Sequence, residues 1–153
     1  MNIPCNGLPC RAAGAVVRGL DLLAPVFDLA IRLWVAKAFW QSGLTKIQSW
    51  DSTLALFEYE YAVPVLPPEI AAWLAAGTEL TMPVLLALGL AGRFSALVLF
   101  VFNIVAALSY PDISPAGLKD HYLWGAMLAV TLFHGPGRLS LDHWLHQRLF
   151  SDR

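Results

Sequence analysis

The sequence predicts an all-α integral membrane protein: a bundle of four transmembrane helices, a short interfacial helix in the first outer loop and an amphipathic C-terminal helix. Three observations support this fold class. Hydrophobic residues make up 58% of the 153 residues, and the mean hydropathy is +0.59. Charged residues are only 14%, against roughly 25% in soluble domains. Four apolar stretches approach the roughly 20 residues that a helix needs to cross a bilayer.

Turn-forming residues set the limits of the four predicted spans, which are Leu22–Ser42, Glu69–Leu90, Arg93–Tyr110 and Leu118–Gly135. Ser42-Gly43 is expected to end the first span, Ala91-Gly92 to form a tight turn after the second, and PDISPAG (111–117) to follow the third. Charged residues interrupt the first apolar run, so we expect a retained helix rather than a secretory signal peptide.

Two further helices are expected outside the spans. In DSTLALFEYEYAV (51–63), Leu54, Phe57 and Tyr61 have helical spacing, and the aromatic residues suit the headgroup zone. DHWLHQRLF (142–150) has an apolar face that is typical of a helix lying on the inner leaflet. The predicted organisation is an N-terminal segment (1–21), a membrane domain (22–137) and a C-terminal segment (138–153).

The Lys and Arg distribution predicts the orientation. One side of the predicted topology carries six arginines, and the other carries only Lys46 and Lys119. The positive-inside rule therefore places both termini in the cytoplasm. The net charge of −1 provides no basic field for nucleic acid.

Polar residues occur at similar depths in three spans. Arg32, Glu79 and Asn103 each lie ten residues from the predicted start of their span, so the sequence predicts that they meet near the bilayer middle. We expect an Arg32–Glu79 ion pair, with Asn103 satisfying remaining donors and Asp28, one turn before Arg32, also bonding the guanidinium. Two roles stay open: a structural clamp between helices, or the polar floor of a ligand or proton site.

Several of these stretches resemble the DoxX family of small four-helix membrane proteins. The resemblance rests on FWQSGLTKI (39–47), PVLLALGLAGR (83–93) and HGPGRLSLD (134–142). FEYEYAVPVLPPEIAAWLA (57–75) is similar to a branch found near biosynthesis clusters for copper-binding peptides. The resemblance implies a multi-pass protein of the bacterial inner membrane, related to a thiosulfate:quinone oxidoreductase subunit and to partners of thiol-redox enzymes. It implies no catalytic residues.

Other candidate residues are few. Cys5 and Cys10 form a C-x4-C pair that is either a soft-metal or redox site or two free thiols. His143 and His146 have a spacing that could hold a metal, but a membrane-surface helix explains them more simply. His121 and Trp124 are candidates for the rim of the buried polar site.

Three functions are compatible with this pattern. The first is a small membrane subunit or partner of a redox or metal-linked system, with quinone as a candidate ligand. The second is a membrane anchor for peptide-modifying or copper-handling proteins of the same pathway. The third is a proton or metal conduit. Four short helices leave little room for alternating access unless the protein forms a homo-oligomer.

Overall fold

The computed structural model describes residues 8–63 and 65–150. These residues form six helices and no strand, so the all-α prediction is confirmed. The helices are α1 (Leu8–Gln48), α2 (Trp50–Tyr59), α3 (Pro68–Leu88), α4 (Gly92–Ser109), α5 (Pro115–His134) and α6 (Leu141–Phe150).

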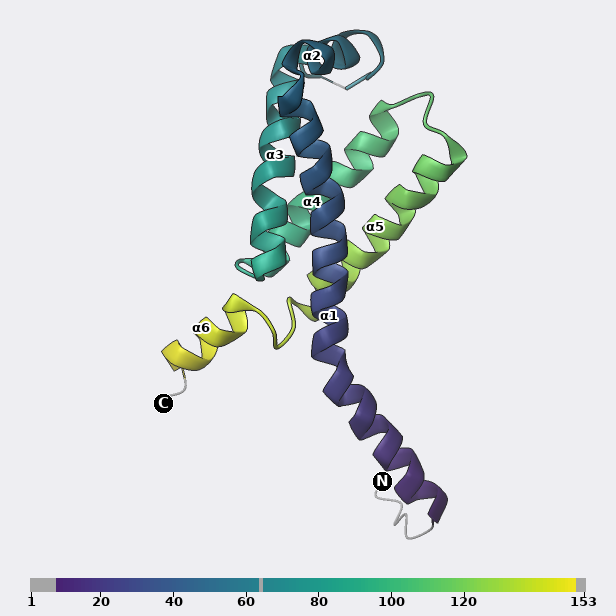
Figure 1. Ribbon diagram of the computed structural model, residues 1–153, viewed down its shortest axis with the longest axis vertical. Helices are drawn as coiled ribbons and strands as arrows, with labels where there is room; N and C mark the ends of the chain where they lie inside the picture. The colour runs from purple at the N-terminus through teal and green to yellow at the C-terminus, as the bar shows by residue number, and fades with distance from the viewer. Residues whose placement is uncertain (1–7, 64, 151–153) are drawn as a thin grey trace.

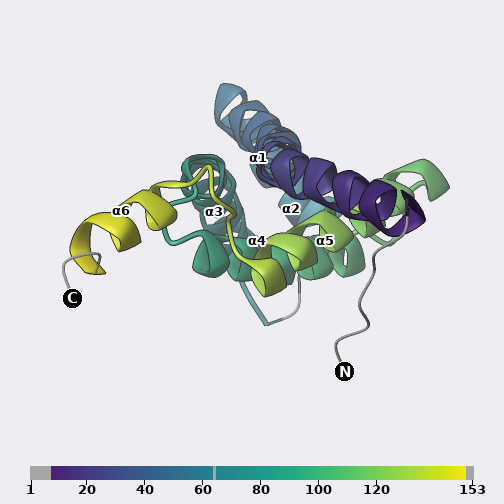
Figure 2. The ribbon, with the colours of Figure 1, turned by 90° about the horizontal axis from the view of Figure 1, so that it is seen from below.

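Four helices pack in a ring. Helix α1 packs against α3, α3 against α4, α4 against α5, and α5 against α1. Helix α2 lies against α3 at one end, which we call the α2 end (Figure 1). Helix α6 and the N-terminal part of α1 leave the opposite end, the α6 end, in different directions (Figures 1 and 2).

Helix α1 is much longer than the predicted first span. It has 41 residues, which at about 1.5 Å per residue gives roughly 62 Å. The prediction that Ser42-Gly43 ends this helix is wrong. Gly43 instead permits close approach to α3, because a Cβ added there would lie 3.0 Å from the Cβ atom of Glu79. Position 43 does require a glycine, but for close packing of α1 against α3 and not for a turn of the chain.

Large apolar side chains lie on the outside of the bundle as well as in its core. Trp73 and Phe133 face outward, whereas Leu99 is fully buried. Small residues lie at contacts between helices, including Ala72 and Ala96, which are fully buried. Helices α3 and α4 are each long and apolar enough to cross a membrane. A continuous apolar exterior around small-residue helix contacts is typical of membrane proteins.

The α3–α4 turn has the tight geometry that Ala91-Gly92 predicts. Gly89 caps α3 in the left-handed conformation (φ 64°), and Ala91 is also left-handed (φ 48°). This turn lies at the α6 end, where the segment before α6 packs on it: a Cβ at Gly92 would be 2.6 Å from Pro136. The fold thus brings residues 89–92 against residues 136–142.

Candidate functional site

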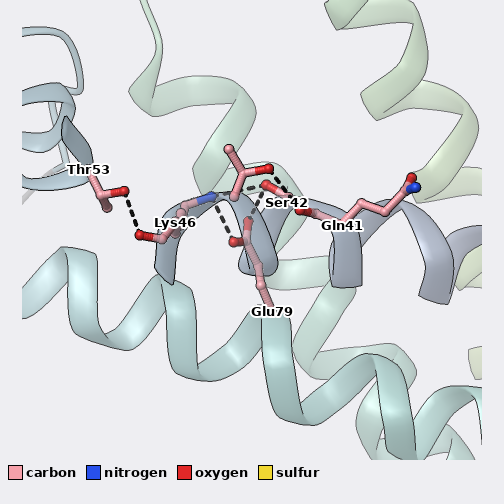
Figure 3. A network of polar contacts seen from close by, with 6 residues as sticks. Gln41, Ser42, Lys46, Thr53 and Glu79 are labelled. Atoms are coloured by element: carbon pink, nitrogen blue, oxygen red, sulfur yellow. Dashed lines mark hydrogen bonds and ion pairs between the residues drawn. The ribbon is translucent and has the colours of Figure 1, made fainter. Parts of the chain in front are cut away.

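Glu79 forms an ion pair with Lys46, not with Arg32. Its Oε2 atom lies 2.7 Å from Lys46 Nζ, and the two side chains are only 6% and 15% exposed. Ser42 lies between them: its Oγ donates to Glu79 Oε1 (3.1 Å) and accepts from Lys46 Nζ (3.0 Å). Figure 3 shows this three-residue cluster bridging α1 and α3. We call it the Glu79 cluster.

The predicted Arg32–Glu79 pair fails because the register of α1 against α3 differs from the one assumed. Gly43 is opposite Glu79, while Arg32 is opposite Gly89, close enough that a Cβ there would meet its guanidinium. Arg32 is therefore ten or eleven residues, or about 15 Å, from the level of Glu79. The predicted depth of Arg32 was counted from Leu22, the expected start of the first span. Helix α1 instead begins at Leu8 and ends at Gln48, six residues after the expected end.

Arg32 acts instead as a donor to backbone carbonyls at the α6 end. It is 1% exposed. Its Nη1 donates to the carbonyls of Leu86 (3.1 Å) and Ala87 (3.0 Å) at the end of α3, and its Nη2 donates to the Leu139 carbonyl. The guanidinium thus joins α1, the C-terminus of α3 and the segment before α6. For Arg32 the geometry fits the structural clamp.

Residues 140–142 complete this connection. The Asp142 carboxylate accepts from the backbone N–H groups of Ala91 (2.8 Å) and Gly92 (2.7 Å), and so satisfies free donors at the start of α4. Asp142 N donates to the Gly89 carbonyl (3.0 Å), and Ser140 Oγ accepts from His143 N at the start of α6 (3.2 Å). We call Arg32, the 86–92 backbone and residues 139–142 the latch.

Asp28 and Asn103 do not bond the guanidinium as predicted. The Asp28 carboxylate lies against Gly137, where an added Cβ would be 2.7 Å from its Oδ2 atom. Asn103 is buried in α4, and its amide pairs with His121 of α5: Asn103 Oδ1 is 2.8 Å from His121 Nδ1, and Asn103 Nδ2 donates to the His121 carbonyl (2.9 Å). The four residues predicted to form one site are therefore spread over the Glu79 cluster, the latch, the Asn103–His121 pair and the contact of Asp28 with Gly137.

A cavity of about 330 Å³ lies at the α2 end, next to the Glu79 cluster. Apolar and aromatic side chains from α1 to α5 form most of its wall, among them Phe39, Phe57, Phe102 and Trp124. Its polar lining includes Ser42, Lys46, Glu79, Ser109 and His121. Glu79, His121 and Trp124 were predicted as site residues, and all three line this cavity; Arg32, Asp28 and Asn103 do not.

This volume is at the lower end of the range for small-molecule sites, which are mostly apolar with a few placed polar groups. The hydroxyl of Ser109 is buried and has no hydrogen-bond partner among the described residues. Tyr61, from the segment after α2, also lines the cavity. Burial raises the pKa of its hydroxyl, and nearby Glu79, Tyr110 and Glu60 raise it further. The cavity can thus accept a largely apolar molecule with at least one polar group.

Comparison with known proteins agrees with this membrane-protein architecture. A family model described as DoxX matches residues 27–111, which include the Glu79 cluster, Arg32 and Asn103. The chain belongs to the DoxX family. It is 32% identical, over 121 residues, to an uncharacterized protein of Haemophilus influenzae; the match covers 74% of this chain and 80% of that protein. DoxX proteins are membrane proteins. A search of solved structures finds no match to this DoxX chain.

Metal ligands are not assembled in the described part of this DoxX protein. Residues 8–63 and 65–150 contain no group of three or more His, Cys, Asp or Glu side chains placed to hold a metal ion. His143 Nε2 is 3.0 Å from Gln147 Nε2. Cys5 and the side chain of Cys10 lie outside the described residues, so the predicted C-x4-C site stays a prediction.

Lys46, Ser42 and Ser109 were missed as site residues. The sequence contained a signal for the first two: they are four residues apart, which places them on one face if the helix continues past Gly43. Ending the first span at Ser42 assigned Lys46 to a loop. Nothing in the sequence around Ser109 distinguishes it from an ordinary helix end.

Proposed function

We propose that this DoxX protein crosses the bacterial inner membrane four times, through α1, α3, α4 and α5, with both termini in the cytoplasm. We propose further that its cavity binds a small, largely apolar ligand of the quinone type, and that the protein serves as a membrane subunit or partner of a redox system. The apolar length of α3 and α4, the family membership and the ring of four helices support the membrane topology.

The charge distribution supports the orientation. Arg18, Arg93, Arg138 and Arg148 all belong to helices or segments at the α6 end, which would face the cytoplasm. The cavity and α2 would then lie in the outer half of the membrane, where the aromatic side chains of α2 suit the interface.

The observation that carries the ligand-binding proposal is the Glu79 cluster on the wall of an apolar cavity. An ion pair buried within a membrane bundle is costly, and such groups are usually retained because they act on a substrate, ion or proton. A purely structural pair would be enclosed by packed side chains. Glu79, Lys46 and Ser42 instead border about 330 Å³ of unfilled space.

Binding of a short-chain ubiquinone, in both redox forms, to the purified protein in phosphatidylcholine nanodiscs tests this proposal. Ala106 lines the cavity, and its neighbour Ala107, equally half-buried, does not. We expect Ala106→Phe to weaken binding by at least about tenfold, since the added ring occupies the cavity, and Ala107→Phe to leave it unchanged. No binding by the wild type, or equal effects of the two substitutions, would contradict the proposal.

The second candidate function is a membrane anchor for cytoplasmic enzymes of a shared pathway, such as peptide-modifying or copper-handling proteins. Exposed apolar side chains at the α6 end favour it: Trp144 and Leu149 of α6, and Val16 and Leu20 of α1. Here, replacing Trp144 and Leu149 by Ser should abolish co-purification of the partner enzymes while quinone binding persists. Unchanged co-purification would refute the anchor.

A further inference from the structure

His121 and Asn103 form a cyclic pair that fixes the orientation of the amide. Asn103 has one side-chain donor and one acceptor group. The group near the His121 backbone carbonyl, at 2.9 Å, must be the donating Nδ2, because two carbonyl oxygens would repel each other there. Asn103 Oδ1 therefore faces the imidazole, 2.8 Å from Nδ1.

The amide orientation in turn fixes the imidazole tautomer. Since Oδ1 only accepts hydrogen bonds, His121 Nδ1 must carry the proton and donate it. In the neutral ring, Nε2 is then an acceptor. Nε2 has no hydrogen-bond partner among the described residues, and His121 is one of the residues that line the cavity. His121 can therefore offer the cavity an oriented acceptor that no protein donor satisfies.

A row of aromatic rings begins at His121. His121 packs edge-on against Trp124, with ring centroids 5.2 Å apart, and Trp124 lies 5.7 Å from Phe39. Phe39 is in turn 6.1 Å from Phe102. All four residues line the cavity. An aromatic ring entering here would find ring faces and edges to pack on, and its polar substituent would meet Nε2.

We propose that the cavity selects an aromatic ring carrying a hydroxyl group, a phenol or hydroquinone, whose O–H donates to His121 Nε2. A carbonyl or ether oxygen at the same position cannot donate, and it would leave Nε2 facing another acceptor. Asn103 is a positioning residue that acts through His121. This inference rests on the proposed ligand-binding function, and it assigns the reduced form of a quinone as the preferred one.

Naphthol has a hydroxyl proton to donate, whereas its methyl ether does not. Comparing their affinities therefore tests this inference separately from the proposed function. Dissociation constants are measured by equilibrium dialysis against the protein in phosphatidylcholine nanodiscs, with empty nanodiscs as the reference. We expect the wild type to bind naphthol about tenfold more tightly than the ether, which is the typical effect of one hydrogen bond. His121→Phe should remove that preference and leave ether binding nearly unchanged. His134→Phe, on the exposed end of α5, is the matched control.

The role of Asn103 has its own readout. The ¹⁵N resonances of the His121 ring report which nitrogen carries the proton, and we expect the Nδ1–H form alone in the wild type. Asn103→Leu should give a tautomer mixture and a reduced naphthol preference. Equal wild-type affinities for the two probes, or a preference that survives His121→Phe, would overturn this inference alone. Absence of binding of both probes would also overturn this inference, and absence of ubiquinone binding in the same nanodiscs would overturn the proposed function with it.

Discussion

Replacing Arg32 by Met should destabilise the protein without altering the cavity. Arg32 supplies the hydrogen bonds to the carbonyls of Ala87 and Leu139, and Leu86 also accepts from Gly89 N. Each buried carbonyl left unpaired costs about 1–3 kcal/mol. Removing the buried cation recovers part of its desolvation cost, so we expect a net loss of about 3 kcal/mol in the free energy of unfolding. Arg32→Lys keeps the positive charge but not the planar guanidinium, which donates several hydrogen bonds at once. It should lower the free energy of unfolding by about half as much.

Unfolding in mixed micelles by SDS, followed by far-UV circular dichroism, measures this loss. Arg138→Met is the matched control because Arg138 is exposed and equally charged. Hydrogen exchange should accelerate at the Ala91 and Gly92 amides, which are held by the neighbouring Asp142 carboxylate. An Arg32→Met protein with wild-type stability, to within about 0.5 kcal/mol, would refute the latch. A variant that loses stability as expected but also no longer binds the cavity ligand under folding conditions would contradict the prediction that the cavity is unaltered.

Further predictions concern the two charged clusters and the helix contacts. Asp142→Ala should lower the free energy of unfolding by about 1–2 kcal/mol, because α4 loses its cap, whereas the exposed Asp51→Ala should change it little. Lys46→Met should lower it by about 3–5 kcal/mol by leaving the Glu79 carboxylate unpaired, and adding Glu79→Gln should restore most of that loss in the same unfolding assay. Gly43→Leu should cost about 1–3 kcal/mol and separate α1 from α3, seen as an increased distance between spin labels on the two helices. Tyr61→Phe should remove the tyrosinate signal that appears at the highest pH in an alkaline absorbance titration, because the raised pKa keeps this hydroxyl protonated to higher pH. Loss of a tyrosinate signal that appears at lower pH would contradict the environment assigned to Tyr61.

Sequence reasoning located α3, α4 and α6 well, although not the ends of α1, because apolar length and turn residues act locally. The observed limits of α3 and α4 differ from the predicted spans by no more than two residues at either end. The α3–α4 turn and the helix at 141–150 were likewise expected from local patterns. Each of these predictions depended only on neighbouring residues.

Pairing between helices could not be predicted the same way, because it depends on the register of one helix against another. A glycine such as Gly43 has the same sequence signature whether it ends a helix or admits a close neighbour. That one ambiguity shifted the register and exchanged Arg32 for Lys46 as the partner of Glu79. The bonds of Arg32 and of Asn103 to backbone carbonyls were also hidden, since every residue has a carbonyl.

The latch also constrains how the chain can be made. Arg32 and its acceptor at Leu139 are separated by 107 positions, so the contact cannot form until the segment before α6 has been synthesised. Until then the guanidinium of Arg32 lacks one of its three carbonyl acceptors. A segment that is synthesised after α5 therefore completes the hydrogen bonds of a buried charge in α1. A stop codon at position 139 would remove both the Leu139 acceptor and Asp142, and so would affect α1 and the start of α4 together.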